Sequence, residues 1–152
     1  MALELPVVNN VAVLVAAIVS MVLGAVWFSP QMFGKQWMKL AMKKMMPPKM
    51  GKQAIAAMKE EMQKGMMKGY ALGFITTLIA AYVLALLVAW IPGTAGVALD
   101  GAMVGFWVWL FVAAVAFSSY IWEKEPLQLY LLKIGHVLVT FVVMGAILAA
   151  WV

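Results

Sequence analysis

Four apolar stretches, each long enough to cross a lipid bilayer, constrain this chain more than any other feature. A transmembrane helix needs about 20 residues at a rise of 1.5 Å per residue. The predicted spans cover residues 8–28, 69–91, 101–122 and 127–151. We therefore expect an all-α protein with one transmembrane domain over residues 1–152, built as an integral membrane four-helix bundle.

The composition agrees with a membrane protein. Hydrophobic residues make up 66% of the chain and charged residues 11%, whereas soluble domains have about 45–50% and about 25%. With so few charged groups, the surface of a soluble domain of this length could not be solvated. The lipid bilayer is therefore the first predicted partner of this chain.

Several kinds of functional site are excluded by residue types that the chain lacks. Cysteine is absent, which removes disulfides, thiolate metal sites and cysteine nucleophiles. Arginine is absent too, so no bidentate clamp for phosphate or carboxylate is available. The sequence also contains no nucleophile elbow, phosphate loop or dinucleotide fingerprint. We expect no enzyme activity, no cofactor, no bound metal and no nucleic-acid partner.

Lysine is distributed unevenly between the two sides of the predicted bundle. Segment 31–68, between the first two spans, holds nine lysines and two glutamates, and the short connection 123–126 adds Lys124. The opposite side has no lysine. Since cytoplasmic loops carry the excess of positive charge, we expect segment 31–68 to be cytoplasmic and both termini to lie outside. Glu123 and Glu125 of the short connection are expected to be solvated.

An aromatic motif stands where the first apolar run gives way to lysines. The chain reads GAVWFSPQMFGKQW from Gly24 to Trp37. Proline lacks a backbone donor, so the Ser-Pro pair is expected to end the helix. Aromatic rings prefer the headgroup level of a membrane. The residues predicted to form this interfacial motif are Trp27, Ser29, Pro30, Phe33 and Trp37.

Segment 31–68 contains ten of the fourteen methionines. Pro47-Pro48 is expected to split it into two helices, and in the second of these Ile55, Met58, Met62 and Met66 fall on one helical face. An amphipathic hairpin on the membrane surface is one interpretation, and a surface that docks a partner protein is another. A copper site is a third, which the surrounding lysines disfavour.

The fourth span carries a stripe of polar residues at helical spacing. These residues are Tyr130, Lys133, His136 and Thr140. Counted from Pro126, Lys133 lies roughly 10 Å deep and His136 roughly 15 Å deep, at 1.5 Å per residue. Lys133 can extend its side chain back to the interface. His136 cannot, and because a charge at that depth is costly we expect it to be neutral and hydrogen-bonded.

The partners predicted for His136 lie on the first two spans. The candidates at similar depth are Ser20, Thr76 and Thr77. One interpretation is an interhelical hydrogen-bond network that fixes the packing. Another is a site for a solute, an ion or a proton, because ionisable residues inside membranes often mark such sites. Ligation of haem by His136 across a dimer is a third.

Small residues recur four positions apart in three of the spans. The pairs are Ser20 with Gly24, Gly69 with Gly73, and Gly101 with Gly105, and the fourth span adds Gly135 and Gly145. Such pairs let two helix backbones approach closely in lipid. They predict close helix crossings, either within the chain or between chains.

Three segments of the chain match a known pattern. The first is Gly24-Ala-Val-Trp27-Phe-Ser-Pro30 followed by Phe33-Gly-Lys-x-Trp37, and the second is KGYALGFITTLIAAYVLA at residues 68–85. The third consists of SSYIWEKEPLQLYLL and HVLVTFVVMGAILAAW, within residues 118–151. In these segments the chain resembles the small four-helix membrane proteins grouped as domain of unknown function 1761. The resemblance implies a multi-pass protein of the bacterial inner membrane with no established activity.

Two hypotheses for the function remain open at this stage. The first is a non-enzymatic membrane protein that acts by assembly, as a homo-oligomer or as an accessory subunit of a larger membrane complex. The second is a small transporter or channel for an anionic or neutral solute, with a polar site around His136 and Lys133. A cationic substrate is disfavoured because no carboxylate lies well inside a span.

Overall fold

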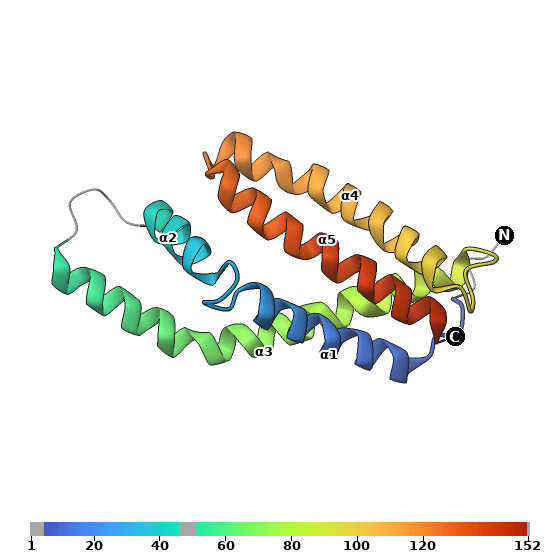
Figure 1. Cartoon of the computed structure of the whole chain (residues 1–152). Helices are drawn as coiled ribbons and strands as arrows, with labels where there is room; N and C mark the ends of the chain where they lie inside the picture. Colours follow the sequence, from blue (N-terminus) through green and yellow to red (C-terminus); the bar gives the residue numbers. More distant parts are fainter. Residues whose placement is uncertain (1–4, 46–50, 152) are drawn as a thin grey trace.

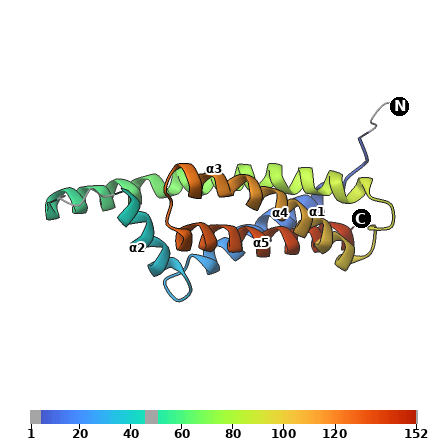
Figure 2. The ribbon, with the colours of Figure 1, turned by 90° about the horizontal axis from the view of Figure 1, so that it is seen from above.

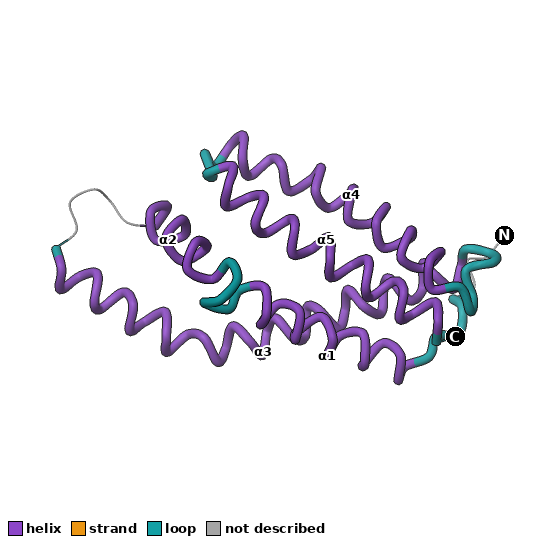
Figure 3. Tube along the Cα trace, in the orientation of Figure 1, coloured by secondary structure: helices purple, strands orange, loops and turns teal. Residues whose placement is uncertain are grey.

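The computed structural model describes residues 5–45 and 51–151, which form five α-helices and contain no strand (Figure 1, Figure 3). The helices are α1 (Asn10–Trp27), α2 (Gly34–Met45), α3 (Lys52–Trp90), α4 (Ala98–Trp122) and α5 (Leu127–Ala150). The predicted all-α fold is confirmed. Pro47-Pro48 lies outside the described residues.

Within the described residues, four segments are long and apolar enough to cross a membrane, and they make this a multi-pass membrane protein. They are Asn10–Trp27, Met67–Trp90, Ala98–Trp122 and Leu127–Ala150. Each corresponds to one of the four apolar stretches in the sequence. The first span ends at Trp27, just before Ser29-Pro30, as proline chemistry predicts.

Helix α3 is longer than the span that the sequence predicts. It runs for 39 residues without a break, and only its last 24 residues, from Met67, form the apolar span. No proline interrupts residues 52–90, so the loop helix continues directly into the membrane helix. We call residues 52–66 the α3 arm; it would extend about 22 Å at the standard helical rise.

The four spans alternate in direction along the chain, and α5 packs against α1, α3 and α4 (Figure 1, Figure 2). Both termini lie at one end, where the side-chain amide of Asn9 donates to the carbonyl of Trp151 at 3.2 Å. We call this the terminal end. The opposite end, which holds α2 and the α4–α5 turn, is called the lysine end. There α3 diverges from the other helices, and α2 lies between it and α5.

Small side chains build the core where α1, α3 and α5 meet. Ala16, Ala17, Ala81, Met144 and Ala149 are completely buried, and larger residues such as Leu84 and Val88 pack around them. Small residues permit close helix approach, which supplies the van der Waals contact that holds helices together in lipid. The core is concentrated toward the terminal end, so the lysine end is less tightly packed.

Helices α4 and α5 cross in backbone contact. A Cβ atom built on Gly101 would overlap the carbonyl oxygen of Gly145, and one built on Gly105 would overlap that of Phe141. A Cβ on Gly145 would in turn overlap the carbonyl oxygen of Gly101. The pair Gly101 and Gly105 is therefore used inside the chain, to seat α5 against α4.

Candidate functional site

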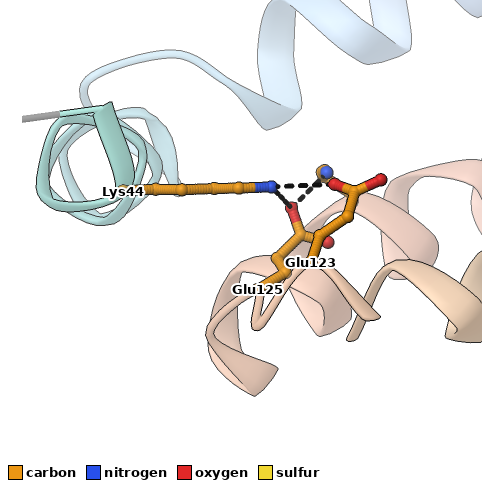
Figure 4. Close-up of polar contacts among 4 residues, drawn as sticks. Lys44, Glu123 and Glu125 are labelled. Atoms are coloured by element: carbon orange, nitrogen blue, oxygen red, sulfur yellow. Dashed lines mark hydrogen bonds and ion pairs between the residues drawn. The ribbon is translucent and has the colours of Figure 1, made fainter. Parts of the chain in front are cut away.

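The polar stripe of the fourth span divides into two parts in the structure. Toward the lysine end, Lys133 reaches back along α5 and donates to Glu125 Oε1 at 2.5 Å. Lys44, on α2, lies 3.7 Å from the same oxygen and 3.2 Å from Glu123 Oε2. Figure 4 shows Lys44 reaching across to both glutamates. We call these four residues the ion cluster.

The expectation that Glu125 is solvated was wrong. Its side chain is only 2% exposed, whereas that of Glu123 is 61% exposed. The chain reverses at Lys124, which has a left-handed φ of 52°. A buried carboxylate needs a paired cation to offset its desolvation, and Lys133 and Lys44 supply two. The signal in the sequence was Lys133 itself, because a lysine inside a span needs a counterion within reach.

Tyr130, the first residue of the stripe, joins α5 to α4. Its hydroxyl donates to the carbonyl of Ala113 at 2.8 Å, and its ring lies 5.6 Å from that of Phe117. Trp109, on α4, joins the same two helices by donating its indole N–H to the carbonyl of Ile134 on α5 at 2.8 Å. Sequence reasoning did not single out Trp109.

His136 and Thr140, deeper in the same span, line a cavity of about 520 Å³ between α1, α3 and α5. We call it the His136 cavity. Its other polar lining residues include three that the sequence predicted, namely Ser20, Thr76 and Thr77. His136 Nε2 lies 3.3 Å from the hydroxyl of Thr140, and its ring packs 5.2 Å from that of Phe28. The predicted partners thus line the same cavity as His136, but the hydrogen bonds of the described residues join His136 to Thr140 of its own helix and to none of the three. Lys133 and Tyr130 have the partners described above.

Three of the hydroxyl groups that line this cavity already donate their hydrogens to backbone carbonyls. Ser20 donates to Ala16 at 2.7 Å, and Thr76 and Thr77 donate to Gly73 at 2.9 and 2.7 Å. Each hydroxyl oxygen keeps lone pairs that can accept a hydrogen bond. These side chains therefore offer the cavity acceptors rather than donors.

A second, larger hollow of about 960 Å³ lies between α2 and α3 at the lysine end. We call it the α2–α3 groove. Trp37, Met38 and Met42 line it from α2, and Lys35 and Lys39 stand on the same helix. It shares four lining residues with the His136 cavity, so the two hollows adjoin; these are Phe28, Pro30, Gly69 and Tyr70.

The interfacial motif forms the tight turn that closes one wall of both hollows. The backbone N–H of Gly34 donates to the carbonyl of Ser29 at 2.9 Å. A Cβ at Gly34 would overlap the carbonyl oxygen of Phe28, so only glycine fits there. Trp27 packs 4.8 Å from Phe33 and donates its indole N–H to the carbonyl of Leu132 at 3.2 Å. Trp27 therefore holds α1 to α5, a role that its predicted place at the interface does not by itself indicate.

Comparisons with known proteins identify the family of this chain but no activity. No curated protein and no solved structure matches the chain. The family model described as "Protein of unknown function (DUF1761)" matches residues 11–149. The match covers the lining of both hollows and all four spans except their outermost residues, Asn10 and Ala150. This multi-pass membrane chain belongs to the DUF1761 family.

Proposed function

We propose that this protein is a non-enzymatic membrane protein that acts by assembly, and that the α3 arm is its assembly surface. The observation that carries the proposal is the continuity of α3. The arm is a continuous helical extension of a membrane-spanning helix, and its described side chains are exposed apart from the partly buried Ile55 and Met58. A helix that leaves its own bundle in this way is suited to pair with another helix.

The partner we propose is a second copy of the chain. Ile55, Met58, Met62 and Met66 recur at spacings of three and four, which is the spacing by which helices pair in coiled coils. Thioether side chains repack easily at such contacts. The alternative form of assembly is an accessory role, in which the arm pairs with a helix of a larger membrane complex.

Disulfide cross-linking in native membranes tests this proposal, because the chain has no cysteine of its own. Ile55→Cys places a thiol on the paired face, and Ala57→Cys places one about 160° away on the same turn, at 100° per residue. We expect dimers from the first variant and few from the second. Equal cross-linking of both variants, or a monomeric mass for the protein in mild detergent, would contradict homo-oligomerisation. A monomer that elutes with a stoichiometric partner would support the accessory role.

We further propose that the lysine end faces the cytoplasm of a bacterial cell, with both termini outside. The support is the distribution of lysine, which cytoplasmic loops concentrate. Thiol labelling of intact cells tests the orientation. A membrane-impermeant maleimide should label Ala95→Cys, in the α3–α4 connection, but label Ala57→Cys only after permeabilisation. The reverse pattern would show the opposite orientation.

Transport of a neutral solute is the second candidate function, and the His136 cavity favours it. Three of its hydroxyls, those of Ser20, Thr76 and Thr77, donate internally and so present acceptors, and Lys133 is paired with Glu125. An anion would find no donor among these three hydroxyls, whereas a neutral solute with hydroxyl groups could donate to them. Vesicles placed in hyperosmotic glycerol shrink as water leaves and re-swell as glycerol enters, and the re-swelling should be faster with the wild-type chain than with Thr77→Val. Identical rates with and without the protein would exclude this candidate.

A further inference from the structure

We propose that the α2–α3 groove binds an anionic phospholipid of the surrounding bilayer, with the headgroup against Lys35 and Lys39 and the acyl chain along Gly69 and Tyr70. This site is separate from the α3 arm, because its lining on α3 begins where the apolar span begins. Three observations carry the inference. They are the depth of the groove in the bilayer, its apolar lining, and two lysines that pair with no carboxylate among the described residues.

The groove lies at the boundary between hydrocarbon and water. Gly69 and Tyr70 stand just inside the span of α3 that begins at Met67. On the other wall, Phe28 and Pro30 directly follow the last residue of α1. A lipid headgroup and the first part of its chain occupy this level of a bilayer. The groove therefore lies at the depth where the headgroup of a lipid joins its acyl chains.

The lining suits an acyl chain. Trp37, Met38, Met42 and Tyr70 provide apolar surface, and Gly69 of α3 leaves space beside it, since a Cβ there would meet no atom within 4 Å. A volume of about 960 Å³ lies in the range of small-molecule pockets, roughly 300–1,000 Å³. Nothing in the described chain fills this space, and lipid is the solvent that surrounds it.

The two lysines beside the groove favour a lipid whose headgroup is negatively charged. Lys35 and Lys39 are one helical turn apart on α2 and share a face. Among the described residues, carboxylates pair instead with Lys44, Lys64 and Lys133. Two exposed ammonium groups beside an apolar groove at this depth attract an anionic headgroup. Basic pockets between transmembrane helices bind anionic lipids by the same chemistry.

Native mass spectrometry of the full chain, titrated with phosphatidylglycerol or phosphatidylcholine, tests the proposal. The wild type should bind phosphatidylglycerol preferentially. Lys35→Gln with Lys39→Gln should weaken that binding about 30-fold, as expected for two lysines near an anionic surface. The matched control is Lys43→Gln with Lys52→Gln, which removes the same charge from two exposed lysines outside the groove lining. The control should bind as the wild type does.

A second variant tests the chain-binding half of the site. Gly69→Leu adds a side chain where the structure leaves open space, so it should fold normally by circular dichroism and yet lose the lipid. Equal binding of the two lipids, or equal weakening by both lysine pairs, would overturn the proposal. So would displacement of the bound lipid by glycerol phosphate as effectively as by phosphatidylglycerol, because the apolar groove would then contribute nothing.

Discussion

The α4–α5 pair and the α2–α3 pair form two opposite kinds of helix contact in one small molecule. Along α4 and α5, backbones touch at Gly101, Gly105 and Gly145. Between α2 and α3, the helices diverge around a groove of about 960 Å³. The first pair holds itself together, while the second leaves its facing surfaces available to lipid or protein. A membrane chain of this size can therefore keep a rigid half and an open half.

The same sequence pattern occurs in both halves, and that is what the comparison teaches. Gly101 and Gly105 are in backbone contact with α5, but a Cβ on Gly69 or Gly73 would meet nothing within 4 Å. Small residues four positions apart allow close approach without requiring it. Whether a glycine pair forms a backbone contact depends on the path of the neighbouring helix.

The largest expected effect is the loss of the α4–α5 contact. In Gly105→Ala, the new methyl group would overlap the carbonyl oxygen of Phe141, and the helices must separate. We expect the free energy of unfolding to fall by about 3 kcal/mol, measured by denaturant titration in detergent micelles. A wild-type stability for this variant would mean that the backbone contact is not what joins the two helices.

The next effect concerns the ion cluster, which attaches the open half to the rigid half. Glu125→Gln removes the buried charge that Lys133 and Lys44 share, and we expect a loss of about 2 kcal/mol, typical of hydrogen bonds to charged groups. The α2 lysines should also become more sensitive to trypsin as α2 detaches.

The matched control for that variant is Glu123→Gln. The Glu123 side chain is 61% exposed, so its pair with Lys44 should contribute less than about 1 kcal/mol. If both variants lose the same stability, or if trypsin cuts the Glu125→Gln protein no faster than the wild type, the ion cluster does not fix α2.

A smaller effect should separate the two tryptophans of α4. Trp109→Phe removes the hydrogen bond to the carbonyl of Ile134 and should cost about 1 kcal/mol. Trp107 is 60% exposed, so Trp107→Phe should change the stability by less than about 0.5 kcal/mol. The same unfolding titration measures both variants. A larger loss of stability in Trp107→Phe than in Trp109→Phe would mean that the indole hydrogen bond does not stabilise the α4–α5 contact.

Sequence reasoning predicted the rigid half better than the open half. Hydropathy and proline positions located the four spans, because lipid imposes their length and composition directly. The polar residues around His136 were also identified as a group, since depth along each helix can be counted. The continuous α3, the burial of Glu125 and the groove were not predicted. The sequence did carry signals for the first two, in the absence of proline from residues 52–90 and in the position of Lys133 inside a span. The groove depends on the angle between helices, which periodicity along one helix does not encode.

The smallest expected effect has the opposite sign and tests the open half directly. Gly73→Ala places a methyl group where the structure has no atom within 4 Å. Alanine is a better helix former than glycine, so the variant should be more stable than the wild type by about 0.5–1 kcal/mol. The same titration would show it, with Gly105→Ala as the contrasting variant. A loss of stability in Gly73→Ala would mean that α3 closes onto a neighbour at this glycine, within the chain or across an oligomer. The open half would then be one state of a helix pair that can also close.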